Sequence, residues 1–245
     1  MKDKINQLFK EKKNLIAILI DPEKAIKDKD FEKFIEGINS SMIDFIFIGG
    51  STASRKQVEL TVDKLKKYCL VPIVLFPGSP DQLSNKADAI LFLSLISGRN
   101  PYYLIESQIE AAENISEMNL ECIPTSYILI DGQTESAVVK VSKTTAIPIE
   151  NPSLIYKTAL AGMLLGHSTT YLEAGSGAKR SVPIDIVKKI ASLQTTLIVG
   201  GGVKTIAQIK DFHQAGANLV VIGNYFEDNP RFLEEVKNYK NQITH

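Results

Sequence analysis

The chain has 245 residues, of which 44% are hydrophobic and 23% charged, as expected for a globular protein with a substantial core. Its 28 basic residues balance its 28 acidic residues, so no overall positive charge points to a nucleic-acid partner. No apolar run reaches the roughly 18–20 residues of a membrane span, and the amino terminus lacks the apolar centre of a signal peptide. The two cysteines show no metal or disulfide spacing, and we expect a cytoplasmic protein.

Short apolar runs alternate with stretches of helical spacing along the whole chain. In chain order we predict strand 15–20, helix 31–38, strand 45–48, helix 58–65, strand 73–76, strand 89–95, helix 101–114, strand 122–130, helix 152–165, strand 169–172, helix 184–191, strand 197–199, helix 206–215, strand 219–222 and helix 232–239. Continuous apolar runs of this length are typical of parallel strands buried on both faces. Residues 137–141 are expected to extend the fifth strand or to return from it.

About eight strands separated by helices predict a single (β/α)8 barrel, the TIM barrel, over residues 1–245. The connection between the strands at 73–76 and 89–95 is too short for a full crossover helix of about ten residues, so the third helix is expected to be short or missing. A doubly wound open sheet is the structural alternative. It would bind ligands at a switch point in the middle of the sheet, and would not need ligand-like loops at the end of the chain.

Glycine clusters follow the last three predicted strands. They are Gly175-Ser176-Gly177, Gly200-Gly201-Gly202 and Gly223-Asn224. Such loops expose backbone N–H groups at strand ends and helix starts, which is how phosphate is held. In (β/α)8 barrels the loops after the late strands commonly form that phosphate site. The sequence therefore favours an enzyme that acts on a small phosphorylated substrate.

Polar residues at other strand ends are candidates for chemistry, because barrel active sites lie there. Glu173 precedes a glycine-rich turn and suits a general base or an acceptor for a substrate hydroxyl. Tyr171 lies on the same side of that strand and either bonds a substrate or fills the upper core. Asp21 is either a metal carboxylate or a turn residue. Ser51 is either a hydroxyl ligand or a helix cap.

Taken together, these motifs resemble geranylgeranylglyceryl phosphate synthase and its bacterial relative, heptaprenylglyceryl phosphate synthase. The resemblance covers nearly the whole chain and rests on Leu19–Lys24, Gly49–Ser51, Ser97–Pro101, Tyr171–Gly177, Gly200–Gly202 and Gly223-Asn224. It implies a modified barrel without a proper third helix. It also implies a Mg2+-dependent prenyltransferase that joins sn-glycerol 1-phosphate to a polyprenyl diphosphate and releases diphosphate.

The resemblance also assigns residues. It implies that Asp21 and Ser51 bind Mg2+, although family members often have threonine at the second position, and that Glu173 takes the proton of the attacking hydroxyl. The residues expected around the glycerol phosphate are Tyr171, Leu172, Glu173, Ala174, Gly175, Ser176 and Gly177, with Gly201, Gly202, Gly223 and Asn224 at its phosphate. Tyr102, Tyr103 and the 104–109 face are expected to line an apolar groove for the prenyl chain.

Several expectations remain alternatives at this point. The length of the chain favours geranylgeranyl diphosphate as donor, with a longer heptaprenyl donor as the alternative. A homodimer or a homohexamer is expected, with a transient membrane contact for product release. A sugar-phosphate isomerase or aldolase is a rival on the same kind of barrel, although no lysine falls within a clear strand. A non-catalytic phosphate-binding or lipid-binding barrel is the rival of a different class.

Overall fold

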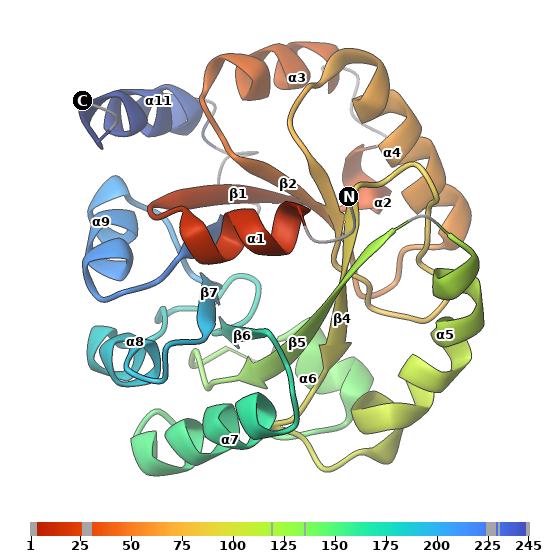
Figure 1. Cartoon of the computed structure of the whole chain (residues 1–245). Coiled ribbons are helices and arrows are strands. Elements are labelled where there is room, and N and C mark those ends of the chain that lie inside the picture. The colour runs from red at the N-terminus through yellow and green to blue at the C-terminus, as the bar shows by residue number, and fades with distance from the viewer. Residues whose placement is uncertain are drawn as a thin grey trace.

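The chain folds into a closed barrel of eight parallel strands, as the computed structural model in Figure 1 shows. The structure describes residues 4–25, 31–118, 120–134, 136–223, 229 and 231–243, with the backbone alone for 31–33. Each strand pairs with the next in sequence, and β8 returns to β1. The strands are β1 Leu15–Ile20, β2 Phe45–Ile48, β3 Ile73–Leu75, β4 Ala89–Ser94, β5 Glu121–Leu129, β6 Thr169–Glu173, β7 Thr196–Gly200 and β8 Leu219–Ile222. Closure confirms the predicted barrel and excludes the open sheet.

Most of the described helices surround this barrel and cover its outer face (Figure 1). They are α1 Lys4–Glu11, α2 Pro22–Ala25, α3 Phe31–Ser40, α4 Arg55–Tyr68, α5 Ser107–Glu117, α6 Ala137–Ser142, α7 Pro152–Leu164, α8 Ile184–Ala191, α9 Ile206–Gln214 and α11 Arg231–Ile243. A π-helical turn, η1 Tyr102–Glu106, precedes α5 where the sequence predicted regular helix. None of the described helices is both long and apolar enough to cross a bilayer.

The prediction for residues 137–141 was wrong, because this segment is helix α6. The Ser136 hydroxyl accepts a hydrogen bond from the Val139 N–H at 3.3 Å and so caps the helix at its start. Val138 and Val139 then pack against the core inside the barrel. An apolar, β-branched segment thus becomes helical because a cap and tertiary packing outweigh its strand propensity.

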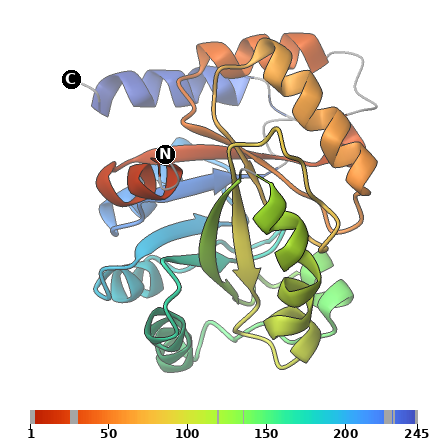
Figure 2. The ribbon, with the colours of Figure 1, turned by 45° about the vertical axis from the view of Figure 1, so that its right-hand side comes forward.

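The third crossover helix is missing, as predicted. Residues 76–88 connect β3 to β4, are all described, and contain only turns and irregular chain. Figure 2 shows this part of the barrel, with α4 in orange and α5 in yellow-green and no helix between them in the chain. The outer face of β3 and β4 therefore lacks the helix that would normally cover it.

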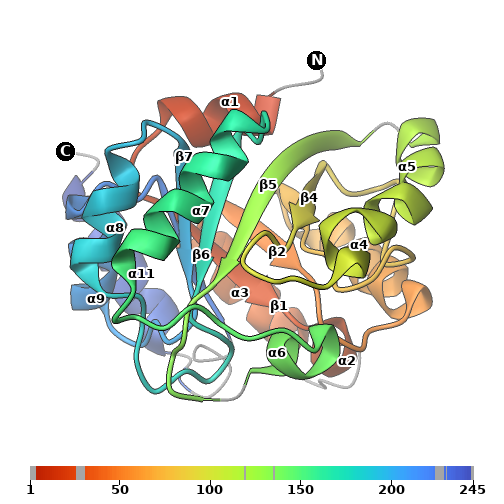
Figure 3. The same cartoon turned by 90° about the horizontal axis from the view of Figure 1, so that it is seen from below.

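Helix α1 closes the amino-terminal end of the barrel. The Phe9 ring packs edge-to-face against Phe45, with ring centroids 4.9 Å apart. The Glu121 carboxylate accepts hydrogen bonds from the Ile5 and Asn6 N–H groups at 2.8 and 2.6 Å, which holds the first turn of the helix. Figure 3 shows α1 at one end of the barrel and α6 at the other. Because α1 closes the amino-terminal end, the barrel is open at the carboxyl ends of its strands.

Neither of the two histidines in the described part of the chain, His167 and His213, lines the cavity at the open end. His213 is buried behind β1, where its Nε2 lies 3.0 Å from the Leu15 carbonyl oxygen and its Nδ1 lies 2.9 Å from the Tyr239 hydroxyl. Burial lowers the pKa of His213 to about 4, so the ring is neutral at physiological pH. It therefore donates through Nε2 and accepts from Tyr239, joining β1 to α9 and α11.

Candidate active site

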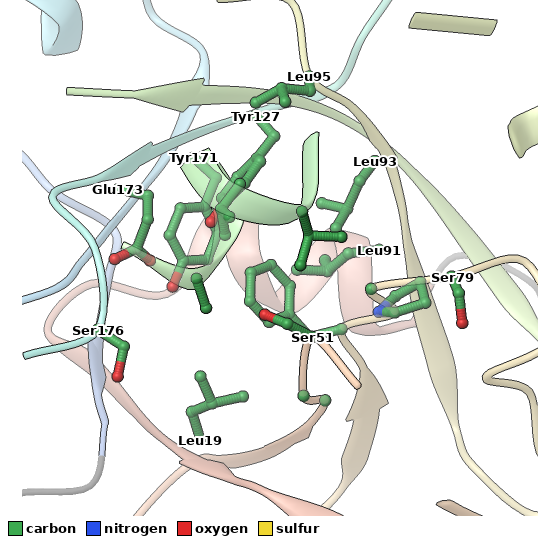
Figure 4. Close-up of a pocket in the computed structure, with 18 of the residues that line it drawn as sticks. Leu19, Ser51, Ser79, Leu91, Leu93, Leu95, Tyr127, Tyr171, Glu173 and Ser176 are labelled. Atoms are coloured by element: carbon green, nitrogen blue, oxygen red, sulfur yellow. The ribbon is translucent and has the colours of Figure 1, made fainter. Parts of the chain in front are cut away.

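A cavity of about 800 Å³ opens at the carboxyl ends of the strands. One part of its wall consists of the polar loops that follow β1, β2, β6, β7 and β8. The other part consists of apolar side chains from β4, β5, η1, α5 and α6, together with Phe76, which follows β3. Figure 4 shows both kinds of lining, with Tyr127, Tyr171 and Glu173 side by side and Leu91, Leu93 and Leu95 on the neighbouring strand.

Glu173 is the buried carboxylate of this cavity. It ends β6, its side chain is 6% exposed, and its Oε1 accepts a hydrogen bond of 2.6 Å from the Gly175 N–H. Burial raises the pKa of Glu173 to about 7, although the Gly175 N–H and the neighbouring Tyr171 hydroxyl act in the opposite direction. A carboxyl group that titrates near neutral pH is well matched to general-base catalysis.

Tyr171 points into the barrel beside Glu173 and is fully buried. Its hydroxyl lies near enough to the Glu173 carboxylate to stabilise the charged form, but it forms no hydrogen bond of ordinary geometry within the described parts of the chain. Burial and the negative charge of Glu173 raise its pKa well above 10, so the hydroxyl keeps its proton and can donate it. A Cβ at Gly200 would come within 2.3 Å of that oxygen, so glycine is required there. A buried hydroxyl without a hydrogen bond is costly, and because Tyr171 lines the cavity its hydroxyl is available to a ligand.

Two aromatic residues that sequence reasoning did not select complete this wall. Phe76, after β3, stacks on Tyr171 with centroids 5.2 Å apart and an interplanar angle of 13°. Tyr127 on β5 contacts Tyr171 edge-to-face at 5.4 Å and is its register partner in the sheet. Strict alternation along β5 would have placed Tyr127 on the same inward level as Tyr171, and that signal was available in the sequence.

The glycine loops after β6 and β7 contact each other and Glu173. Gly175, Gly177, Gly201 and Gly202 all have φ between +68° and +100°, a range that favours glycine. A Cβ at Gly201 would lie 2.4 Å from Glu173 Oε1, so the β7 loop packs directly on the carboxylate. These tight backbone turns suit phosphate binding through N–H groups.

The structure separates the predicted substrate residues into two groups. Those that line the cavity are Tyr171, Glu173, Ser176, Gly177, Gly201, Gly202 and Gly223. Leu172 and Ala174 instead lie in the apolar layer between barrel and helices, because alternate residues of a strand point to opposite faces. Gly175 does not line the cavity, and its N–H donates a hydrogen bond to the Glu173 carboxylate. Asn224 lies outside the described residues.

Asp21 and Ser51, the predicted metal ligands, both line the cavity on the side of β1 and β2. Asp21 Oδ1 accepts a hydrogen bond from the Glu23 N–H at 3.0 Å, so it also caps α2. A Cβ at Gly50 would lie 2.9 Å from Asp21 Oδ1, which shows how closely the loop after β2 approaches Asp21. The described residues hold no cluster of three metal-binding side chains. One carboxylate and one hydroxyl fit Mg2+, which commonly takes few protein ligands and completes its shell with phosphate oxygens and water.

Other polar residues near the strand ends are engaged elsewhere. Ser97 Oγ accepts a hydrogen bond of 2.9 Å from the Leu129 N–H, which ties β4 to β5. The Arg99 guanidinium donates to the Gly98 and Ile96 carbonyl oxygens at 2.6 and 3.3 Å. Neither residue lines the cavity, whereas Lys24, Lys140 and Lys204 do.

The apolar part of the cavity extends over the rim of the barrel into the place of the missing helix. Its wall includes side chains that belong to the interior of the barrel and others that belong to the layer under the helices. The interior set is Leu91, Leu95, Tyr127 and Tyr171, and the outer set includes Leu83, Ile90, Ala111 and Ile115. The groove is therefore bounded by the outer face of β4 and by α5.

The expected groove wall on residues 104–109 needs correction. Ile105 and Ile109 are 55% and 66% exposed and face away from the cavity. The face of this segment that lines the groove carries Tyr103, Gln108 and Ala111 instead. Because η1 is π-helical, the residues after it face other directions than they would in a regular α-helix that began at Pro101.

A second cavity of about 410 Å³ adjoins the groove at the amino-terminal side of β4 and β5. It shares Phe92 and Ile115 with the first cavity and is otherwise lined from α5 and the start of β5. These two side chains therefore lie between the two cavities.

Comparison with known proteins agrees with this geometry. Residues 6–240 match the PcrB family. The chain is 46% identical over 232 residues to geranylgeranylglyceryl phosphate synthase of Flavobacterium johnsoniae, covering 93% of this chain and 95% of that one. It is 47% identical over 227 residues to the protein of the same name from Zunongwangia profunda, covering 92% and 96%.

A solved structure is similar over the same length. It is (S)-3-O-geranylgeranylglyceryl phosphate synthase from Thermoplasma acidophilum in complex with sn-glycerol-1-phosphate. The TM-score is 0.87 at 30% identity, with 97% of this chain and 95% of that chain covered. The barrel without a third helix, its polar and apolar cavity and these matches lead to one conclusion: the chain belongs to the PcrB family.

Proposed function

We propose that this protein is a Mg2+-dependent prenyltransferase that joins geranylgeranyl diphosphate to sn-glycerol 1-phosphate. The observation that carries the proposal is that the buried Glu173 and the glycine loops lie in the same cavity as an apolar groove. Such a cavity suits one small phosphorylated substrate and one substrate with a long apolar chain. The similarity to synthases of this name, one with sn-glycerol-1-phosphate bound, supports it.

In this proposal the glycerol phosphate binds at the β6–β8 side. Backbone N–H groups of Gly177, Gly201, Gly202 and Gly223 hold its phosphate without a permanent positive charge. The Tyr171 hydroxyl donates a hydrogen bond to a glycerol oxygen. Glu173, when ionised, accepts the proton of the attacking hydroxyl as that oxygen forms a bond to the first carbon of the prenyl chain.

The donor binds at the opposite side of the same cavity. Its apolar chain lies along β4 and α5, and its diphosphate lies near Asp21 and Ser51, with Lys24 also in the wall. Mg2+ bound by Asp21, Ser51 and phosphate oxygens would neutralise the charge of the leaving diphosphate. The bond between carbon and diphosphate oxygen breaks, the ether bond forms, and the proton leaves on Glu173.

We propose a 20-carbon donor, in line with the names of the similar synthases, and we propose that Phe92 and Ile115, which line both cavities, limit the length of the bound chain. A heptaprenyl donor would need the space beyond these side chains. The homodimer or homohexamer expected from the sequence remains a prediction.

A prenyltransferase assay tests the proposal directly. Purified protein is incubated with Mg2+, labelled sn-glycerol 1-phosphate and prenyl diphosphates from C10 to C35, with glycerol 3-phosphate as the stereochemical control. The expected product is a prenylglyceryl phosphate, formed fastest with the C20 donor and lost on addition of EDTA. Absence of product with every donor would return the barrel to the isomerase, aldolase or binding-protein alternatives.

A further inference from the structure

Gln82 is a buried side chain in the irregular connection that replaces the third helix. It is 2% exposed, and both ends of its amide are bonded to backbone groups. Its Nε2 donates to the carbonyl oxygens of Gly50 at 2.8 Å and Ala53 at 2.7 Å, and its Oε1 accepts from the Gly78 N–H at 2.8 Å. Buried polar side chains with complete partners specify one arrangement of the chain around them.

These hydrogen bonds join two loops of the active site. Gly50 and Ala53 flank Ser51 and Thr52 in the loop after β2, and Gly78 lies in the loop after β3. The two loops are in direct backbone contact, because a Cβ at Gly78 would come within 2.8 Å of the Gly50 carbonyl oxygen. Gly50 in turn packs on the Asp21 carboxylate. Gln82 thus fixes the position of Gly50, which packs on Asp21 and precedes Ser51, the two proposed metal ligands.

Gln82 itself does not line the cavity, whereas Ser51, Thr52 and Gly78 do. A side chain in this position acts on bound substrate only through the loops that it holds. The loop after β2 leads into α4, whereas the loop after β3 is followed by no helix. The buried Gln82 amide ties the second loop to the first through three hydrogen bonds to backbone groups.

We propose that Gln82 is a positioning residue, which holds the Ser51 loop in the conformation that binds the diphosphate of the donor with its Mg2+. This inference rests on the proposed function, because it assumes that the diphosphate lies beside Asp21 and Ser51. It predicts a selective effect. Loss of the three bonds weakens diphosphate binding and leaves the glycerol phosphate site, formed by the loops after β6 and β7, intact.

The test compares three variants by calorimetry. Gln82→Met keeps the volume of the side chain and removes all three hydrogen bonds, and Gln82→Glu keeps an acceptor for Gly78 but places a carboxylate against two carbonyl oxygens. Gln57→Met is the matched control, since Gln57 accepts from the Ser54 N–H at 2.8 Å to cap α4 and touches neither Gly50 nor Gly78. Each protein is titrated with inorganic diphosphate in Mg2+ and separately with sn-glycerol 1-phosphate.

Gln82→Met should lose about tenfold or more in diphosphate affinity, since small displacements of positioning groups have large effects. The affinity for glycerol phosphate should change less than about twofold, and the donor KM should rise in parallel with the loss of diphosphate affinity. Gln57→Met should bind both ligands like wild type. Lowering the pH should partly restore diphosphate binding to Gln82→Glu relative to wild type at the same pH, because a protonated carboxyl regains one donor.

Equal affinities in wild type and Gln82→Met would overturn the inference. So would a parallel loss of both ligands in Gln82→Met and Gln82→Glu, which would show a general loss of structure. If the wild-type protein bound glycerol phosphate but no diphosphate in Mg2+, the donor assignment itself would fail, and the inference with it. Binding of both ligands by wild type together with unselective variants would refute the inference alone.

Discussion

The two halves of the cavity are built by different means. On the β6–β8 side, short strands end in glycine loops that are followed by covering helices, and the groups proposed to act are the Glu173 carboxylate, the Tyr171 hydroxyl and a set of backbone amides. On the β3–β5 side a helix is absent, and the cavity takes its place between β4 and α5. The regular half offers fixed polar groups for a small ligand. The irregular half offers apolar surface that a regular barrel would have covered.

This contrast separates chemistry from selectivity. Substitutions on the regular half should act on turnover, whereas substitutions on the irregular half should act on the choice of the donor. The loop after β2, which carries Ser51 and contacts Asp21, lies between the two and should affect the binding of the leaving group. The following experiments test that division.

The largest effect is expected for Glu173→Gln. The amide cannot accept the hydroxyl proton, so kcat should fall by about 10²- to 10⁴-fold, while glycerol phosphate still binds. Single-turnover rates and calorimetric binding of sn-glycerol 1-phosphate measure the two quantities separately. Turnover equal to wild type would remove Glu173 from the mechanism and end the distinction between the halves.

Asp21→Ala should mainly change the response to metal. Loss of an outer-shell partner lowers metal affinity by roughly 10- to 100-fold, and loss of a direct ligand should cost no less. The Mg2+ concentration for half-maximal activity is the measured quantity, with Gln57→Met as a variant of the neighbouring helix that should leave it unchanged. An unaltered Mg2+ titration would refute the metal assignment.

The pH profile should report the buried carboxylate. Because the pKa of Glu173 is raised from 4.5 to about 7, kcat/KM should fall about tenfold for each pH unit below 7, as the base becomes protonated. The free energy of unfolding should change with pH in the opposite direction to kcat/KM. Between pH 4.5 and 7, Glu173 is protonated in the folded protein and ionised in the unfolded chain. The contribution of Glu173 to the free energy of unfolding is therefore fully present below pH 4.5 and is lost as the pH rises to 7.

Glu173→Gln supplies the control for this prediction. Its residual activity should lack the step near pH 7, and its unfolding free energy should lack the corresponding loss between pH 4.5 and 7. An acid limb that is unchanged in the variant would assign the step to another group.

The smallest effect is expected on the irregular half. Phe92→Ala should connect the groove with the second cavity and shift the ratio of kcat/KM for C35 over C20 donors upward by about tenfold, as expected for a change in an apolar pocket. Ile109→Ala removes a side chain on the exposed face of α5 and should leave the ratio unchanged. A constant ratio in Phe92→Ala would place the end of the groove elsewhere.

Much of the barrel could be predicted from the sequence because buried parallel strands are continuous apolar runs. Residues 184–191 and 219–222 were assigned with the observed bounds, and the missing third helix followed from the length of one connection. Segment 137–141 could not be assigned correctly, because its helical state depends on the Ser136 cap and on packing of Val138 and Val139 against the apolar cluster inside the barrel.

The site was partly predictable for the same reason. Residues at strand ends, such as Glu173 and Asp21, lie at the open end of any parallel barrel, and the structure places both in the cavity wall. Leu172 was included through its neighbours, although strand alternation turns it to the opposite face. Gln82 gave no sequence signal, since its role depends on backbone groups that come together only in the folded chain.

The missing helix has a thermodynamic consequence. Ile90 and Phe92, on the outer face of β4, line the groove between β4 and α5, and we expect the chain of the proposed donor to cover apolar surface there. Removal of apolar surface from water lowers the heat capacity. Binding of the prenyl donor should therefore carry a negative heat-capacity change that resembles a final step of folding, whereas binding of glycerol phosphate at the glycine loops should carry little.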